Sequence, residues 1–486
     1  MKLSGTLKFF ATVVALLALL CIVFPSDGIA IGGTELRFPK LHKVLVREKQ
    51  KDIKELLPPE QEARDLTGIT DSIADCRHTI FESQIRFWLP NDDVTLFDPF
   101  FKRAEQAEGK KQIVRVLHYG DSQIEQDRIS CRLRERLQMT FGGGGPGMLP
   151  LRQPIPTITF NQQTTGSLVG QSTYGDSSFI RARGNYGPML RSWRLDGSVS
   201  MQLYSSKGRY ASERAGHFSS IRVLFNNRPG PLSVSMHDRK GQGPYNGSKN
   251  SQGIDMISWR MDSSTTSASL TLTGHADIYG VLVDDGYGVA VDNISMRGVS
   301  GHQFTMTNAD QLAEAYRLMN VGLIIMQFGG NSVPYLKTEK AIDNYCTRLG
   351  EQIDFVRQAC PGAVILFIGP SDMSTTVKGR FSTYPMMPTL VARLREMANA
   401  HGAAYWSIYD AMGGYESMLV WVRSGYAGSD YIHFTHKGAR IMGDYLSDAV
   451  LKLYELYQLR QQLSKEKFSE IWNSLSKPQQ ISQNNE

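Results

Sequence analysis

A serine that follows an apolar segment is the first residue of this chain whose setting suits chemistry. Residues 114–119 form an apolar, β-branched run that predicts a buried strand, and Gly-Asp-Ser follows directly, ending at Ser122. Residues 124–139 then repeat apolar side chains at helical spacing. We therefore expect Ser122 at the carboxyl end of a strand, where open α/β sheets bind ligands, with its backbone N–H at a helix N-terminus.

A serine hydroxyl needs a base before it can act as a nucleophile, and the sequence offers one far from Ser122. Asp430 and His433 lie three residues apart, so one loop can supply both an imidazole and the carboxylate that orients it. His436 is a rival base, but the residue three positions before it is His433 rather than an acid. We therefore favour His433.

Two other strand ends offer hydrogen-bond donors for a developing oxyanion. The apolar run 321–328 predicts a buried strand that ends at Gly-Gly-Asn, and the side-chain amide of Asn331 can donate there. The strand-like residues 289–294 precede Gly301, whose backbone N–H offers a second donor.

These blocks, in this order along the chain, resemble the SGNH hydrolases, also called the GDSL family: Ser122, Gly301, Asn331 and Asp430-x-x-His433. The resemblance covers roughly residues 111–148 and 290–458. It implies catalysis by Ser122, His433 and Asp430, with an oxyanion hole formed by the Ser122 and Gly301 N–H groups and the Asn331 amide. It also implies that no metal ion and no organic cofactor is needed.

The chain departs from the family pattern at two positions. Gln123 stands where many members have Leu, and Ser332 stands where many continue with Asp. Neither residue touches the expected chemistry. Gly298 competes with Gly301 for the glycine role, and we favour Gly301 because its setting before a helical segment better matches the family's second block.

The bulk composition excludes one class of partner. The chain has 486 residues, with 53 Lys and Arg against 47 Asp and Glu, for a formal net charge of +6. A small excess on a chain of this length does not indicate a nucleic-acid-binding protein, which concentrates its basic residues in a patch. The length suffices for two or three domains with their own cores.

The N-terminus has the sequence pattern of an export signal. Lys2 and Lys8 precede the apolar run 9–24, and small residues near Ala30 offer a cleavage site. An apolar run of this length is short against the roughly 17–25 residues that span a bilayer, so we predict cleavage within residues 1–30. The protein would then lie in the periplasm or the cell envelope. If the N-terminal segment stays uncleaved, we expect contact with the membrane through that segment only.

The remaining sequence divides by character. Residues 31–110 predict a charged spacer and a helical lead-in, and residues 111–149 and 290–460 alternate strand and helix patterns. Residues 150–289 show short alternating runs separated by turn signals, which predicts an inserted antiparallel β-sandwich, carbohydrate-binding-like in its layout. The fold class is therefore α/β, a doubly wound parallel sheet with this insertion, followed by a polar tail at 461–486.

Several features suggest sites that we reject. The glycine run 142–147 lacks the Lys-Ser/Thr of a phosphate-binding loop, and we expect a mobile loop. A second Gly-Asp-Ser, ending at Ser177, follows polar sequence rather than a strand. Acids near strand ends lack calcium-loop spacing, so we expect them to be solvated: Asp284, Asp285 and Asp292.

The cysteines beyond the signal show no disulfide or zinc spacing: Cys76, Cys131, Cys346 and Cys360. Three of them fall in helical patterns, and we expect buried small apolar side chains there more than disulfides: Cys131, Cys346 and Cys360.

The layout is similar to that of peptidoglycan O-acetylesterases, in which a carbohydrate-binding-like module interrupts the catalytic domain. This resemblance implies an exported esterase that removes O-acetyl or other short acyl groups from a cell-envelope glycan, with peptidoglycan as one candidate. Two alternatives stay open: a glycan O-acetyltransferase using the same three residues, and a non-catalytic glycan-binding protein of the envelope.

Overall fold

The structure is a computed structural model. It describes residues 5–23, 29–31, 34–36, 68–153, 155–175, 184, 186–228, 230–238, 243 and 245–476. The chain divides into two compact units, Met1–Glu55 and Leu56–Glu486, each described by itself. The first unit contains α1 (Gly5–Val23) and the antiparallel strands β1 (Ile29–Ile31) and β2 (Thr34–Leu36). Among the residues given above, no helix is long and apolar enough to cross a membrane.

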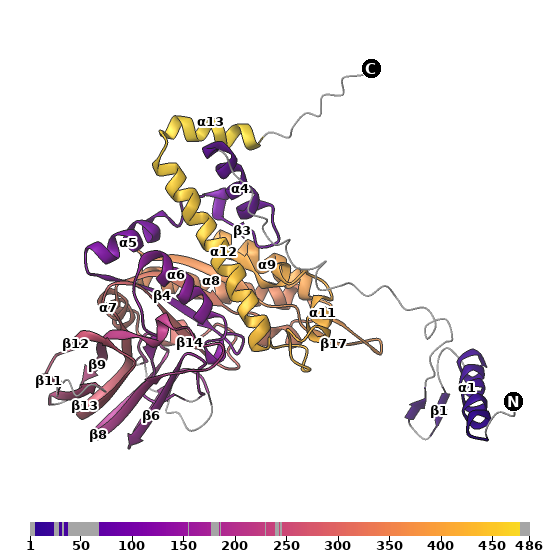
Figure 1. Cartoon of the computed structure of the whole chain (residues 1–486), viewed down its shortest axis with the longest axis horizontal. Coiled ribbons are helices and arrows are strands. Elements are labelled where there is room, and N and C mark those ends of the chain that lie inside the picture. Colours follow the sequence, from indigo (N-terminus) through magenta and orange to yellow (C-terminus); the bar gives the residue numbers. More distant parts are fainter. Residues whose placement is uncertain are drawn as a thin grey trace. The chain divides into compact units, whose positions relative to one another are not determined.

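A six-stranded sheet in the order β14-β4-β15-β16-β19-β3 forms the centre of the second unit (Figure 1). Its strands are β3 (Phe87–Trp88), β4 (Ile113–Gly120), β14 (Gly288–Ser295), β15 (Val321–Gln327), β16 (Val364–Gly369) and β19 (Ala404–Ser407). The pairs from β14 to β19 are parallel, and β3 pairs antiparallel with β19. Every residue of β4, β15 and β16 is buried, as expected when both faces of a parallel sheet are covered.

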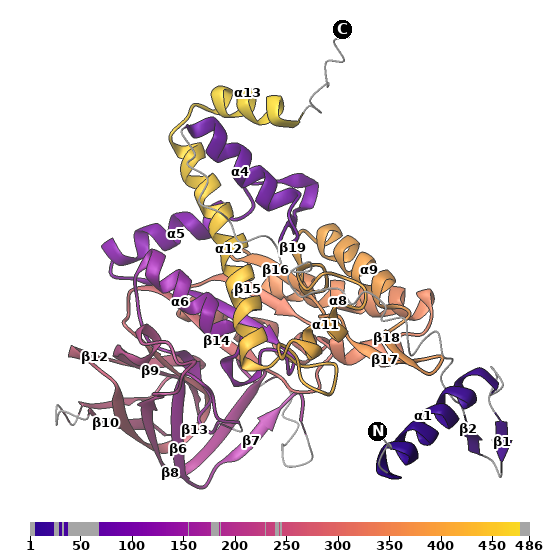
Figure 2. The same cartoon turned by 45° about the vertical axis from the view of Figure 1, so that its right-hand side comes forward.

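Helices lie on both faces of this sheet (Figure 2). One face contributes Leu117, Ile324 and Phe367 to a buried apolar cluster shared with α7 (Ala309–Met319), α8 (Glu339–Ala359) and α9 (Met387–Ala400). The opposite side is covered by α5 (Asp98–Gly109), α6 (Ser130–Phe141) and α12 (His436–Gln461). The predicted doubly wound α/β class is confirmed.

Shorter elements complete this part of the fold. The helices are α4 (Ile69–Phe81), α10 (Ile408–Ala411), α11 (Ser417–Arg423) and α13 (Lys465–Ser476). The 3₁₀ turns are η1 (Pro90–Asp92), η2 (Glu125–Asp127), η3 (Arg214–Gly216), η4 (Phe304–Met306) and η5 (Gly330–Tyr335). A separate hairpin is formed by β17 (Ser374–Val377) and β18 (Arg380–Thr383).

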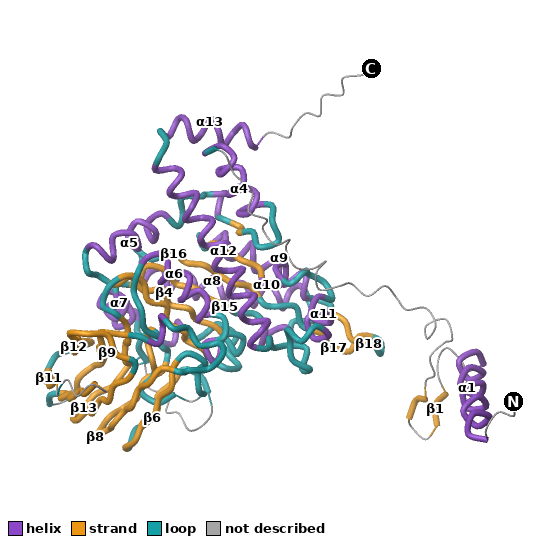
Figure 3. The backbone as a smooth tube through the Cα atoms, in the orientation of Figure 1, coloured by secondary structure: helices purple, strands orange, loops and turns teal. Residues whose placement is uncertain are grey.

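Nine antiparallel strands lie beside the parallel sheet (Figure 3). They are β5 (Gly147–Leu149), β6 (Phe160–Gly166), β7 (Val169–Ser172), β8 (Arg191–Ser205), β9 (Phe218–Asn227), β10 (Leu232–Asp238), β11 (Tyr245–Lys249), β12 (Ile254–Thr265) and β13 (Ser267–Asp284). The long strand β13 joins them, because its first half pairs with β10 and β8 and its second half pairs with β9 and β5. These strands fall between β4 and β14 along the chain, although β4 and β14 are neighbours in the parallel sheet. Residues 56–486 form one compact unit, so the domain boundaries stay a prediction.

A buried ion network joins the two sheets. Arg115 on β4 binds Asp292 on β14 through Nε (2.8 Å) and Nη2 (2.7 Å), and its Nη1 binds Asp284 on β13 at 2.6 Å. All three side chains are fully buried. The expectation that Asp284 and Asp292 are solvated is therefore wrong, because two acids from separate strands enclose one guanidinium.

The glycine run between α6 and β5 is packed rather than loose. Gly145 has φ +82°, and a Cβ there would lie 2.4 Å from the Val283 carbonyl oxygen. Gly147 has φ +88°, and its Cβ would lie 2.5 Å from the Val291 carbonyl oxygen. The predicted mobile loop is wrong, because these glycines allow the backbone to approach β13 and β14 more closely than any side chain would permit.

The predicted polar tail contains a helix. Lys465–Ser476 forms α13, whose Trp472 ring lies 6.0 Å from Phe81 on α4, with the Arg77 guanidinium 5.1 Å above the Trp472 ring. A few aromatic side chains at helical spacing therefore suffice to hold a segment whose overall composition is polar. Residues 477–486 lie outside the described residues, as does the second Gly-Asp-Ser at 175–177 beyond Gly175. The four cysteines of the second unit are free, and three of them are buried.

Candidate active site

Ser122 lies in a tight turn directly after β4, with the Glu125 N–H donating to its carbonyl oxygen at 3.3 Å. The predicted helix does not follow at once, because η2 comes first and α6 begins only at Ser130. Gln126 and Asp127 have φ values of +62° and +67°, which no α-helix accommodates. The prediction that the Ser122 N–H lies at a helix N-terminus is therefore wrong.

The cause of this detour is the buried carboxylate of Asp127. It binds Arg134 on α6 through two nitrogens, at 2.5 and 3.0 Å, and accepts a hydrogen bond from Thr159 Oγ1 at 2.6 Å. A bidentate Arg–carboxylate pair of this kind fixes geometry as well as charge. It compensates for the unusual backbone that turns the Asp127 side chain inward.

The structure brings Ser122, His433 and Asp430 together. Ser122 Oγ lies 2.7 Å from His433 Nε2, and His433 Nδ1 lies 2.7 Å from Asp430 Oδ2. A carboxylate can only accept, so Nδ1 carries the proton and leaves Nε2 free to accept from the serine hydroxyl. This is the arrangement in which a histidine can act as general base toward a serine.

Asp430 is held in its ionised form by its own loop. Its Oδ1 accepts from the backbone N–H groups of Ile432 (3.0 Å) and His433 (3.1 Å). Partial burial opposes ionisation, but the hydrogen bonds from the His433 ring and from these two N–H groups outweigh it and lower the pKa of Asp430. A permanent negative charge thus faces the His433 ring.

The rival histidine lies elsewhere. His436 begins α12, and its ring stacks on Tyr210 with centroids 5.4 Å apart. Burial and the charge of Arg128 lower the pKa of His436. No hydrogen bond joins it to Ser122 among the described side chains, whereas His433 contacts the Ser122 hydroxyl.

The two predicted oxyanion donors lie on segments that contact each other. Asn331 Nδ2 donates to the Val299 carbonyl oxygen at 3.0 Å and lies 3.3 Å from Asp121 Oδ2. The next carbonyl oxygen, that of Ser300, accepts from Tyr345 Oη at 2.8 Å. Asn331 thus holds the segment that carries Gly301, and one of its N–H groups makes only a long contact.

Of the two competing glycines, Gly301 is the more constrained. It has φ +94° and is buried, and a Cβ would lie 2.8 Å from Leu349 Cδ2 and 2.9 Å from Phe328 Cγ. Gly298 also has a positive φ, +76°, but it is exposed with open space around it. Both the backbone conformation and the packing favour glycine at 301, whereas only the backbone conformation favours it at 298.

Gln123 ties the serine turn to the histidine loop, a role that sequence reasoning missed. Its Nε2 donates to the Ile432 carbonyl oxygen (2.6 Å) and to Ser371 Oγ (2.9 Å), and its Oε1 accepts from the Phe434 N–H (3.3 Å). One buried amide therefore holds the peptide groups on both sides of His433. The signal in the sequence was a polar residue at a position where the family pattern places an apolar one.

Arg128 makes a second tie between the same loops. Its guanidinium donates to the carbonyl oxygens of Ser122, Glu125 and Phe434. Burial lowers the pKa of this group, and the neighbouring carboxylates partly offset the effect. Gln123 and Arg128 together thus fix the position of the nucleophile turn relative to the histidine loop.

Comparison with known proteins identifies a family whose model matches part of the chain. The model of the GDSL-like Lipase/Acylhydrolase family matches residues 262–441. This segment contains Gly301, Asn331, Asp430 and His433 in the family's order, and Ser122 precedes it because the antiparallel strands intervene. The chain therefore contains a GDSL-like, SGNH-type hydrolase domain. It is an ester hydrolase of the GDSL type.

Solved structures resemble this SGNH hydrolase. A peptidoglycan O-acetylesterase captured in action is 22% identical, over 73% of this chain and 95% of that chain, with a TM-score of 0.58, which shows a common fold. Family two carbohydrate esterases from Corynascus thermopiles (13% identity, 59% of this chain, 99% of that chain) and Cellvibrio japonicus (9%, 61%, 99%) align with TM-scores of 0.28 and 0.26. No curated protein matches the chain in sequence.

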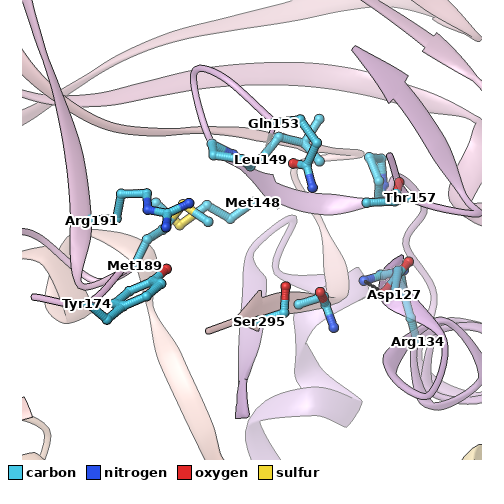
Figure 4. A pocket seen from close by; sticks show the side chains of 13 residues that line it. Asp127, Arg134, Met148, Leu149, Gln153, Thr157, Tyr174, Met189, Arg191 and Ser295 are labelled. Atoms are coloured by element: carbon cyan, nitrogen blue, oxygen red, sulfur yellow. Dashed lines mark hydrogen bonds and ion pairs between the residues drawn. The ribbon is translucent and has the colours of Figure 1, made fainter. Parts of the chain in front are cut away.

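A small cavity opens one strand away from the nucleophile strand of the SGNH hydrolase (Figure 4). Ser295 in its wall pairs in register with Gly120, and the Asp127–Arg134 ion pair and Met148 also line it. Its volume is about 40 Å³, where one water takes up roughly 10–15 Å³. It therefore has room for a few waters. Within the described part of the chain, no cluster of three or more His, Cys, Asp or Glu could hold a metal ion.

Replacing Gln123 with leucine, the residue common in the family, should slow the SGNH hydrolase. The change removes two hydrogen bonds to the residues that flank His433 and one to Ser371. Small displacements of a catalytic group can cost up to about 100-fold in rate. We expect kcat for p-nitrophenyl acetate to fall about 10- to 100-fold with little change in KM. Gln202→Leu, at an exposed position on β8, is the matched control. A wild-type kcat in Gln123→Leu would show that the Gln123 side-chain hydrogen bonds are not needed for catalysis.

Asp121 makes the stability of the SGNH hydrolase depend on pH. Burial raises the pKa of this carboxyl from 3.8 to about 6, although the hydrogen bond from the Gln123 N–H and the electrostatic interactions with His433 and Arg128 oppose the shift. The folded state therefore holds this proton more tightly than the unfolded state does. The resulting stabilisation is complete below about pH 4 and is lost as the pH rises to about 6.

Asp121→Asn should remove this dependence, because asparagine does not titrate. Two pKa units correspond to about 3 kcal/mol. We expect the change in unfolding free energy between pH 4 and pH 7, measured by urea denaturation, to differ by about 2–3 kcal/mol between the two proteins. Other groups that titrate in this range cancel in the comparison. Parallel pH profiles would contradict the assignment to Asp121.

Proposed function

We propose that this SGNH esterase is exported and removes O-acetyl or other short acyl groups from a cell-envelope glycan, through an acyl-enzyme on Ser122. The observation that carries the proposal is the pair of 2.7 Å contacts that link Ser122 Oγ to His433 and His433 to Asp430. A serine hydroxyl in contact with an oriented, neutral imidazole is equipped for acyl transfer.

In the first step, His433 Nε2 takes the proton from Ser122 Oγ as the oxygen attacks the ester carbonyl carbon. The bond from that carbon to the sugar oxygen then breaks, and His433 returns the proton to the leaving sugar hydroxyl. Asp430 stays ionised throughout, because its pKa is lowered, and it stabilises the imidazolium form of His433.

In the second step, a water molecule loses its proton to His433 and attacks the acyl carbon, which releases the carboxylic acid and restores Ser122. The negative charge on the carbonyl oxygen is accepted in both steps by the backbone N–H groups of Ser122 and Gly301 and by the Asn331 amide. The long 3.3 Å contact of that amide with Asp121 is the one that an oxyanion would replace. Each such donor contributes about 10²- to 10³-fold in rate.

Two further observations support a glycan as the acyl carrier. The solved structure with the same fold at a TM-score of 0.58 is a peptidoglycan O-acetylesterase. The apolar run 9–24, preceded by two lysines, has the pattern of an export signal, which would bring the enzyme to the envelope where such polymers lie.

The test is acetate release by the purified chain lacking residues 1–30. The substrates are O-acetylated peptidoglycan, acetylated xylan and p-nitrophenyl acetate, and Ser122→Ala is measured alongside. We expect Ser122-dependent release from peptidoglycan above that from xylan. Release only from the small ester would contradict a glycan substrate. Acetyl transfer to an added oligosaccharide in place of acetate release would make the enzyme a transferase.

A further inference from the structure

The catalytic side chains lie at an open surface. The side chains of Asp430 and His433 are 48% and 34% exposed. A glycan can therefore present its ester to Ser122 while it lies across the surface of the protein. Its affinity and its position then depend on side chains that surround the serine rather than on an enclosed pocket.

An aromatic stack lies at the edge of this surface. Tyr431 stands between Asp430 and His433 in the catalytic loop, and its ring stacks on Phe381 of β18 with centroids 4.4 Å apart and planes inclined by 16°. The Phe381 side chain remains 50% exposed although Tyr431 covers one of its faces. The other face of the Phe381 ring is therefore turned to solvent.

Hydrogen bonds hold the segments that carry the two rings of the stack. Tyr431 has φ +56°, a conformation that a bulky residue rarely adopts, and its carbonyl oxygen accepts from the Ser374 N–H at 3.2 Å. Ser382, next to Phe381, binds Tyr415 Oη (2.8 Å) and Glu416 (3.0 Å) through its hydroxyl. Backbone strain that the surrounding structure maintains is typical of functional sites.

We propose that the solvent-facing ring of Phe381 is a platform on which a pyranose ring of the glycan stacks, adjacent to the sugar that carries the ester. Flat apolar rings bind the C–H face of a sugar without needing a charge, so a large exposed aromatic face beside the reacting atoms suits a carbohydrate chain. This inference rests on the proposed glycan esterase function and adds where the polymer is held.

The position of the stack fits this role. Tyr431 is two residues from His433, so at most about 7 Å of chain separates their Cα atoms. The Phe381 ring lies 4.4 Å from the Tyr431 ring, so it is close enough to the catalytic loop to contact a sugar that neighbours the esterified one. Phe381 makes no ring contact or hydrogen bond with Ser122 or His433 among the described side chains, so we expect its removal to affect polymeric substrates more than small esters.

The test compares kcat/KM for an acetylated oligosaccharide with kcat/KM for p-nitrophenyl acetate. The variants are Phe381→Leu, which keeps apolar cover over Tyr431 but has no flat face, Phe381→Ala, and Phe381→Tyr, which restores the ring. We expect the oligosaccharide-to-small-ester ratio to fall about tenfold in Phe381→Leu and Phe381→Ala, through KM, and to recover in Phe381→Tyr. Tyr204→Ala on β8 is the control, because Tyr204 is 38% exposed on the antiparallel sheet.

Each outcome decides the proposal. An unchanged ratio in Phe381→Leu overturns the platform, and so does an equal loss on both substrates, which would mean that Phe381 only supports the catalytic loop. A fall in Tyr204→Ala instead would place sugar binding on the antiparallel sheet. Wild-type enzyme that hydrolyses only p-nitrophenyl acetate would overturn the glycan esterase function itself, a result distinct from failure of the platform alone.

Discussion

Ser122→Ala should lower kcat/KM for p-nitrophenyl acetate by about 10⁴-fold or more, the scale of effect seen when a catalytic serine is removed. Ser122 Oγ is the atom within 2.7 Å of His433 Nε2, and alanine leaves nothing there to attack the ester. Residual hydrolysis would come from the oxyanion donors and from substrate binding. Initial rates of p-nitrophenol release, followed at matched protein concentration, measure the effect.

The control is built into the sequence, since Ser177 ends a second Gly-Asp-Ser. Ser177→Ala should keep wild-type kcat/KM, because that tripeptide follows polar sequence rather than a buried strand. Loss of activity in Ser177→Ala with retention in Ser122→Ala would reverse the assignment. Thermal unfolding of each variant verifies that both remain folded.

Arg115→Leu should destabilise the second unit by about 3–5 kcal/mol, the usual cost of removing one partner of a buried ion pair. Arg115 is enclosed by the carboxylates of Asp284 and Asp292, and without it Arg222 would remain bound to Asp284. Asp292 would keep a hydrogen bond from the Met148 N–H at 2.7 Å and a longer-range interaction with Arg134, but it would have no ion pair with any described residue.

The free energy of unfolding, from urea denaturation near pH 7, measures this effect. Arg317→Leu is the control, because Arg317 pairs with Glu314 at the surface and is 68% exposed, where ion pairs contribute little. A destabilisation of Arg115→Leu no larger than that of Arg317→Leu would mean that the network does not hold the two sheets together.

The sequence predicts the parallel sheet and its strand ends well, because these features follow from short-range patterns. Fully apolar runs such as 321–328 mark strands buried on both faces, and loop residues after such strands meet at one edge of the sheet. That rule brings Ser122, Asn331 and the 430–433 loop close together from positions some 300 residues apart, and the structure places them so.

The incorrect predictions share a physical cause, which is contact between segments distant in sequence. Asp127 turns inward to meet Arg134 and breaks the expected helix, and Asp284 is buried because Arg115 lies across from it. The glycine run is fixed by β13 and β14 rather than by its own composition. Gln123 is a residue whose role depends on a loop some 310 positions later. No local pattern contains such partners.

The serine that a fluorophosphonate modifies identifies the nucleophile of the enzyme directly. The chain lacking residues 1–30 is incubated with the reagent until p-nitrophenyl acetate hydrolysis stops, then digested and mapped by peptide mass spectrometry. We expect a single adduct on Ser122, with labelling lost in His433→Ala because the serine is no longer activated. Full hydrolytic activity without an adduct, or inactivation by an adduct on another serine, would contradict the assignment of Ser122 as the nucleophile.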